Sequence, residues 1–225
     1  MLNSELSAIS DHMFELGTSA LAHANWHANY MSFENHMWPE LSVLQAAHAA
    51  EILIKARIAK EHPLLIFDQV PKSTQVHDPK LGLKNLFEKA KTIQYSELPE
   101  RLWAATGIKL KNIDTYKKFG YLRNTIQHFT SPSDVDCSAE TREFIYQIID
   151  PFIHDCWGIT AVDYNEDYEP YVHLMANLIN NGIEFLVSPE AAQQLQYTQL
   201  DWPNKKYKSF MLQRFQQAGA DVNGL

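Results

Sequence analysis

The chain has few of the residues that interrupt helices or build disulfides. Among its 225 residues there are 8 glycines and 2 cysteines. Because glycine weakens helices, its scarcity, together with a hydrophobic content of 45%, favours a compact helical protein. Two cysteines, Cys137 and Cys156, are too few for the disulfide framework of a small secreted protein. We therefore expect a reducing, cytoplasmic environment.

Long apolar runs are also missing from the sequence. No segment approaches the roughly 20 consecutive apolar residues that a helix needs to cross a bilayer, so we expect no membrane association. The first residues, MLNSELSAISDHMFEL, lack a basic start followed by a continuous apolar stretch. A secretory signal is therefore not expected. The sequence also contains no glycine-rich phosphate loop and no serine nucleophile elbow.

Positive charge is scarce in the whole chain but concentrated in one part of it. The formal net charge of −8 argues against nonspecific binding to duplex DNA. Residues 80–123 contain ten Lys/Arg and four Asp/Glu, a net charge of +6, whereas residues 124–190 carry a net charge of −11. Such a basic segment could attract a phosphate backbone locally. Alternatively, its lysines simply solvate helix faces.

Apolar residues recur at three- and four-residue steps through most of the chain, which is the period of helices with one buried face. The widest apolar face belongs to residues 40–61, which we expect to form a central helix. Other helices are predicted, in chain order, at 2–24, 18–38, 83–92, 96–106, 112–130, 138–157, 171–181, 189–196 and 206–217. The proline-rich connection at 62–80 contains one candidate strand, at 64–67.

Single residues predict where some of these helices begin, bend or end. Gly17 allows a break between the first two helices, and Gly107 is a suitable stop for the helix before it. Ser138 is expected to cap the helix that follows it. Pro151 is expected to kink that same helix, because proline cannot donate a backbone hydrogen bond.

The clearest chemical signal lies in the predicted helix at 112–130, NIDTYKKFGYLRNTIQHFT. Asn124 and His128 are four residues apart and share a face of this helix. Arg123 is offset from His128 by about 140°, at roughly 100° per residue. Apolar residues bracket the three polar side chains, which places them at the edge of a core, where their geometry could be tuned. An ordinary solvated helix face would contain the same residue types.

Arg123, Asn124 and His128 match the motif of the HEPN superfamily, in which an arginine and a polar residue, often asparagine, precede a histidine after four to six intervening residues. The predicted helix containing HAAEILIKARIAKEH also resembles an early helix of that superfamily. The sequence predicts an all-α, up-and-down four-helix bundle, HEPN-like, within residues 40–157. Its helices would be at 40–61, 83–93, 111–130 and 138–157. Residues 1–39 and 158–225 would add helical extensions at both ends, the second packed on the bundle.

The resemblance implies a metal-independent endoribonuclease that needs no cofactor, of the kind found in toxin–antitoxin and anti-phage defence systems. The partner would be RNA, whose 2′-OH is the nucleophile. His128 would move the proton, Arg123 would stabilise charge on the phosphate, and Asn124 would orient either group. One helix supplies one histidine, so a homodimer with facing motifs is expected.

A regulatory partner protein such as an antitoxin is a further expectation from the resemblance. Some HEPN toxins carry a tyrosine two residues beyond the histidine, which a paired nucleotidyltransferase modifies. Thr130 occupies that position here, which argues against that form of regulation.

Three further residues are candidate contacts for RNA: Glu51, Lys117 and Lys118. Glu51 has an alternative role, because it is spaced to form a local ion pair within its own helix. His23 and His27 are four residues apart and could share a metal. No second pair of ligands is spaced to complete that site, so no metal is predicted.

Two functions other than the ribonuclease remain open. The first is a non-catalytic HEPN-like module that binds nucleotides or RNA and keeps the basic patch. The second is a structural helical interaction protein. In that protein Arg123 would be bonded to an acid and His128 would be packed shut.

Overall fold

The computed structural model describes residues 6, 8–76, 80–167, 170–195 and 200–223. Most of these residues are helical, so the predicted all-α class is confirmed. Their contacts form two compact units. The first contains the described residues up to Thr18 together with Ala49–Leu110, and the second contains Ser19–His48 together with the described residues from Lys111 onward. The predicted boundaries after residues 39 and 157 stay a prediction.

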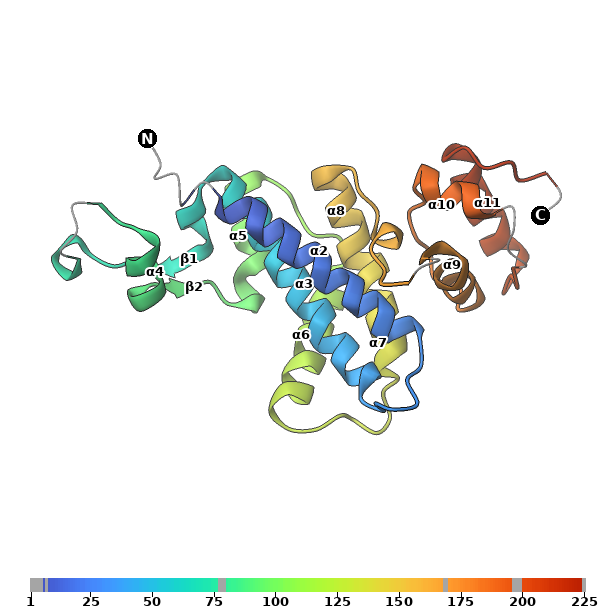
Figure 1. Cartoon of the computed structure of the whole chain (residues 1–225), viewed down its shortest axis with the longest axis horizontal. Coiled ribbons are helices and arrows are strands. Elements are labelled where there is room, and N and C mark those ends of the chain that lie inside the picture. Colours follow the sequence, from blue (N-terminus) through green and yellow to red (C-terminus); the bar gives the residue numbers. More distant parts are fainter. Residues whose placement is uncertain (1–5, 7, 77–79, 168–169, 196–199, 224–225) are drawn as a thin grey trace. The chain divides into compact units, whose positions relative to one another are not determined.

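Two long helices, α2 (Ile9–Asn29) and α3 (Trp38–Glu61), each contribute residues to both units and lie side by side (Figure 1). The break that Gly17 allows does not occur, because α2 passes through this glycine, and the separate helix predicted at 18–38 was wrong, since α2 itself continues to Asn29. A Cβ atom at Gly17 would lie 2.7 Å from Cγ of Leu53, so the glycine permits close packing of the two helices. The start predicted at residue 2 lies outside the described residues.

The first unit continues from α3 into a small strand pair. The 3₁₀ helix η1 (Pro63–Ile66) leads into β1 (Phe67–Gln69), which pairs antiparallel with β2 (Lys91–Thr92). The predicted strand at 64–67 is therefore displaced toward the C-terminus. Buried Ile66 and Ile93 flank the pair, and the Ile93 amide donates to the Ile66 carbonyl at 3.0 Å.

The helix predicted at 83–92 is shorter in the structure, because α4 covers only Leu83–Lys89 and the residues after it join the strand pair. The unit also contains η2 (Ser73–Gln75), η3 (Tyr95–Glu97) and α5 (Leu98–Thr106). The α5 helix ends at Gly107 as predicted, with φ at 76°, a conformation that favours glycine.

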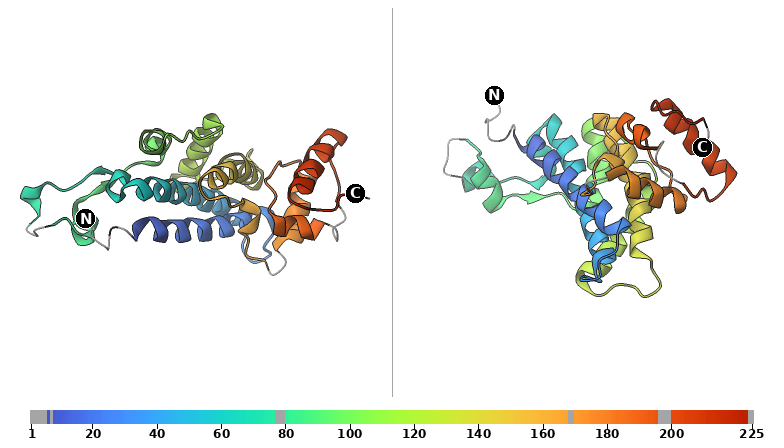
Figure 2. Two further views of the ribbon diagram at one scale, coloured as in Figure 1. Left: turned by 90° about the horizontal axis from the view of Figure 1, so that it is seen from above. Right: turned by 45° about the vertical axis from the view of Figure 1, so that its right-hand side comes forward.

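The second unit is built around α6 (Ile113–His128) and a continuous helix that runs through α7 (Cys137–Phe144), η4 (Ile145–Ile149) and α8 (Asp150–Trp157) (Figure 2). Phe119 of α6 stacks on Phe144 of α7, with ring centroids 3.8 Å apart. The cap of α7 was predicted wrongly. Asp136 caps it through Oδ1, which accepts from the Ala139 amide at 2.9 Å, and Ser138 lies inside the helix.

The segment η4 is a π-helix, and it directly precedes the turn of α8 that contains Pro151. Proline lacks the N–H that would bond to the carbonyl four residues earlier. The helix widens instead, and the Asp150 amide donates to the Ile145 carbonyl five residues back. A π-helical stretch therefore precedes Pro151, and the predicted kink at this proline stays a prediction.

The C-terminal part of the second unit contains η5 (Ala161–Asp163), α9 (Pro170–Asn180), α10 (Pro189–Gln194) and α11 (Lys205–Gln217). The three helices predicted here are confirmed to within two residues, apart from Gln196, which lies outside the described residues. No helix in the described part of the chain is long and apolar enough to span a membrane.

Buried polar side chains connect the helices of the second unit to its loops. Asn25 of α2 donates to the carbonyls of Ala161 and Tyr164, and it accepts from the hydroxyl of Tyr146. The carboxylate of Asp150 accepts from the amides of Ala161 and Leu186, both at 2.8 Å. Burial raises the pKa of Asp150 to about 7, against the opposing effect of these two hydrogen bonds.

Candidate functional site

The helix α6 divides into a buried face and an exposed face. Tyr116, Phe119 and Leu122 are buried and pack the helix into the second unit. At about 100° per residue, the opposite face carries a stripe that consists of Lys117, Tyr121, Asn124 and His128. The exposed side of α6 therefore combines polar, basic and aromatic groups, and the core does not need them for its packing.

Arg123 begins on the inner side of α6, since it follows Tyr116 by seven residues and Phe119 by four. It is half-buried, and its Nη1 donates to Oδ1 of Asn124 at 2.9 Å. No carboxylate of the described residues forms an ion pair with Arg123. The hydrogen bond to the neutral side chain of Asn124 thus holds the guanidinium of Arg123 at the border between the core and the exposed stripe.

His128 is the last residue of α6, and its side chain is exposed. The structure brings Arg123 and Asn124 into direct contact and places Asn124 and His128 on one face, as the spacing predicted. The imidazole of His128 has no hydrogen bond to a described residue. It is consequently free to meet a ligand or a second copy of the chain.

The predicted basic contacts differ from one another in their surroundings. Lys117 is exposed on the stripe, whereas Lys118 donates to Glu140 of α7 at 2.6 Å. Lys111 is likewise paired, with Asp155 of α8 at 3.1 Å. Acidic neighbours therefore neutralise part of the positive charge that residues 111–123 carry in the sequence.

Glu51 belongs to the first unit, and its carboxylate is bound by the ammonium group of Lys55 at 2.6 Å. Lys55 is almost fully buried, with 5% of its surface exposed. The pair lies one helical turn apart on α3, as the local alternative predicted. A contact between Glu51 and RNA stays a prediction.

The two histidines that were weighed as metal ligands have separate partners. His23 pairs with Glu166 at 3.0 Å, and His27 shares a hydrogen bond of 2.7 Å with Gln45. Burial lowers the pKa of His27, and the hydrogen bond to Gln45 partly opposes this effect. Among the residues that the structure describes, no group of three or more potential ligands is placed to hold a metal ion.

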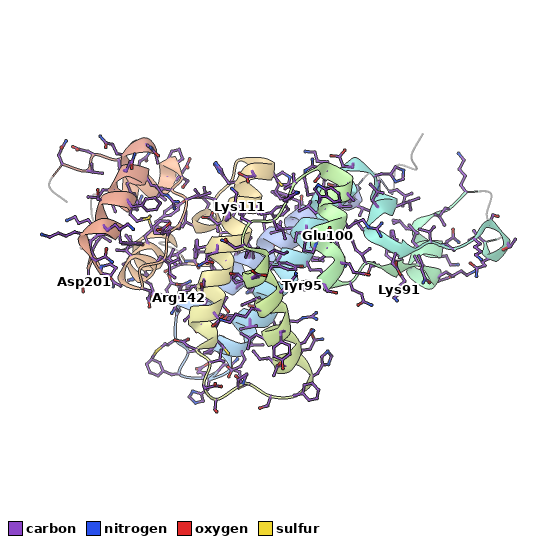
Figure 3. All side chains as sticks on the ribbon, turned by 180° about the vertical axis from the view of Figure 1, so that it is seen from behind. Lys91, Tyr95, Glu100, Lys111, Arg142 and Asp201 are labelled. Carbon is purple, nitrogen blue, oxygen red and sulfur yellow. The ribbon has the colours of Figure 1, made fainter. Side chains whose placement is uncertain are left out.

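Two cavities of the second unit were not predicted from the sequence. One, of about 660 Å³, lies along α8 and is lined by charged residues that include Lys111, Asp155 and Arg214. The other, of about 530 Å³, is lined by residues of the α2–α3 connection and by Arg142 of α7, and we call it the Arg142 pocket. Figure 3 labels Lys111 and Arg142, one residue from each cavity.

The fold and the exposed polar stripe define a helical protein with a candidate site at the end of α6. Comparisons with protein-family models, with curated proteins and with solved structures found no match to the chain. The resemblance to the HEPN superfamily therefore depends on Arg123, Asn124, His128 and the helical pattern around them.

Proposed function

We propose that the chain is a metal-independent endoribonuclease of HEPN type, with a role as a toxin or an anti-phage defence component. The observation that supports this most directly is the end of α6, where Arg123 contacts Asn124 and His128 is exposed. Core packing accounts for Tyr116 and Phe119 but not for these three residues. The proposal includes a HEPN-like four-helix bundle within residues 40–157.

The proposed reaction uses the nucleophile that RNA itself carries. His128 takes the proton from the 2′-OH or gives a proton to the leaving 5′-oxygen, which general acid–base catalysis requires at neutral pH. Arg123 binds the phosphate through its guanidinium and stabilises the charge that develops there. Asn124, which accepts a hydrogen bond from Arg123, holds the guanidinium in position. The products are a 2′,3′-cyclic phosphate and a free 5′-hydroxyl.

The surroundings of the motif favour this proposal over a purely structural role. A structural role predicts that Arg123 is bonded to an acid and that His128 is packed shut. Instead, Arg123 contacts an amide and His128 is exposed. A non-catalytic module that binds nucleotides or RNA would have the same exposed groups, so it remains the second candidate.

The proposal places two motifs face to face across a homodimer. Tyr116 and Phe119 of α6 cannot form this contact, because each is only 1% exposed and packs in the core. Tyr121 and Phe129 are 77% and 86% exposed, and they flank the motif on both sides. An isologous contact that covers these two rings would bring the second histidine to the site.

Cleavage of RNA by His128→Ala tests the proposal. Because general acid–base catalysis is typically worth about 10²–10⁴-fold, the variant should cleave RNA slower by that factor while unfolding like the parent. Cleavage by the parent should persist in EDTA and leave a cyclic phosphate. His154→Ala is the matched control, since it removes another exposed histidine of the second unit. Equal rates for His128→Ala and the parent would show that His128 is not the catalyst.

A further inference from the structure

Arg142 is a buried arginine that forms no ion pair with a described carboxylate, and the nearby charge that acts on it is that of Asp136. It lies in the last turn of α7 with 9% of its surface exposed, and its Nη1 donates to the Ala28 carbonyl at 2.6 Å. Its Nε is buried and has no hydrogen-bond partner among the described residues. No described carboxylate lies within ion-pair distance of it. A buried guanidinium with donors to spare is costly unless a ligand satisfies it.

The Arg142 pocket has further features that favour an anion. The first turns of two helices, α3 at Trp38 and α7 at Ser138, contribute to its lining. Amide groups at helix N-termini are unsatisfied within the helix and carry partial positive charge. The lining contains one acid, Asp136, and its Oδ1 already accepts from the Ala139 amide. The charged residues of the lining are thus one arginine, Arg142, and one carboxylate that is already held by the protein.

The size and the lining of the pocket indicate what kind of molecule could carry an anionic group to Arg142. A volume of about 530 Å³ is within the range of pockets that bind small molecules. Beside Arg142, the lining includes the aromatic residues Tyr30 and Trp38 next to polar residues such as Asn29 and His36. Tyr30 is stacked on Trp26 at 4.2 Å between centroids, which holds this wall in place. The two aromatic residues therefore offer a flat surface on which a ring could stack.

We propose that the Arg142 pocket binds a small ligand in which a phosphate or carboxylate group is attached to a ring-sized apolar body. Arg142 bonds the oxyanion through guanidinium donors that the protein leaves unused, and the aromatic wall contacts the body. Neither Arg123 nor His128 lines this pocket, so the proposal is independent of the ribonuclease.

The test measures binding of defined probes to the full-length protein by calorimetry and by the shift in thermal unfolding. Phenyl phosphate and benzoate carry the two candidate anions on the same ring, and benzyl alcohol is the uncharged control. We expect saturable binding of at least one anion, a raised Tm, and no comparable effect of benzyl alcohol. Tighter binding of phenyl phosphate identifies a phosphate ligand, and tighter binding of benzoate identifies a carboxylate.

Two substitutions test whether Arg142 is responsible for binding the anionic probes. Arg142→Gln should weaken binding of the preferred anion about tenfold or more. Arg214→Gln is the matched control, because Arg214 also donates Nη1 to a backbone carbonyl, that of Phe185, but does not line this pocket. If Arg142→Gln does not fold, Ser138→Glu keeps Arg142 and adds an opposing charge to the lining, and it should weaken binding similarly.

Three outcomes would overturn the proposal. The first is that neither anion binds the parent at millimolar concentration. The second is that benzyl alcohol binds as tightly as the anions. The third is that a folded Arg142→Gln or Ser138→Glu variant binds as tightly as the parent. Since no RNA is present, these outcomes are separate from any failure of the ribonuclease proposal.

Discussion

Asp150 is the residue whose ionisation the fold changes most clearly toward neutral pH. Its pKa is 3.8 before folding and about 7 in the folded chain, because burial disfavours the carboxylate. Between these values the folded state holds a proton that the unfolded state has released. Stability from this group is complete below about pH 4 and is lost as the pH rises to about 7.

We therefore predict a pH-dependent difference between the parent and Asp150→Asn. As the pH is raised from about 4 to 7, the free energy of unfolding of the parent should fall relative to that of the variant. The steepest slope should be about 1.4 kcal/mol per pH unit. Urea denaturation at several pH values measures this difference, in which effects of other titrating groups cancel. A difference that stays constant with pH would contradict the assignment.

Arg142 shows what sequence reasoning missed at the residue scale. In the sequence it is an isolated arginine in an acidic segment, and such residues are usually exposed. Its burial depends on Ala28 of α2, more than a hundred residues away, whose carbonyl it binds. Arg123 and His128 could be found because their relationship is local, within one helix.

At the scale of elements, the close contact between α2 and α3 determines how a substitution at Gly17 changes the stability of the protein. Gly17→Ala gains helix propensity of about 1 kcal/mol but places a Cβ 2.7 Å from Leu53 Cγ and 3.3 Å from its backbone nitrogen. Overpacking of this kind typically costs about 1–3 kcal/mol. We expect net destabilisation in the parent background.

A double-mutant cycle separates the two effects. In a Leu53→Ala background the obstructing Cγ and Cδ2 atoms are absent, so Gly17→Ala should become neutral or stabilising. Chemical denaturation of the four proteins measures the coupling. Equal effects of Gly17→Ala in both backgrounds would show that the glycine is required by the backbone and not by the neighbouring side chain.

The elements also show which signals a sequence can carry. Gly107 ended its helix as expected because the requirement is local, a positive φ at one residue. From the sequence Gly17 only allowed a break, whereas in the structure it admits Leu53 from another helix. The strand β2 has two residues, too few for an alternating pattern to be visible, and its pairing with β1 depends on a distant segment.

At the scale of the whole molecule, the proposed active unit is a homodimer. An Arg123→Ala chain and a His128→Ala chain should each be inactive alone. Mixed after joint refolding, they should recover part of the activity, because one heterodimer contains one intact arginine and one intact histidine on opposite subunits. Cleavage assays on the mixture measure this recovery. Absence of recovery in confirmed heterodimers would exclude a composite site.

The dimer surface can be tested separately from the chemistry. Phe129→Ser should weaken self-association in sedimentation experiments, since Phe129 is 86% exposed beside the motif. Phe87→Ser is the matched control, because Phe87 is 82% exposed but belongs to α4 of the first unit. Equal effects of the two substitutions would place the dimer contact elsewhere.

The π-helix η4 limits where a residue can be deleted from this chain during evolution. Removing one residue from 145–149 would restore an α-helical register and rotate every later residue of α8 by about 100°. The carboxylate of Asp150 would then turn away from the amides of Ala161 and Leu186, which it now accepts from. A substitution within this stretch alters one side chain. A deletion would break both hydrogen bonds by which Asp150 holds the backbone at Ala161 and Leu186. Descendants of this gene should therefore conserve the length of η4 more strictly than its residues.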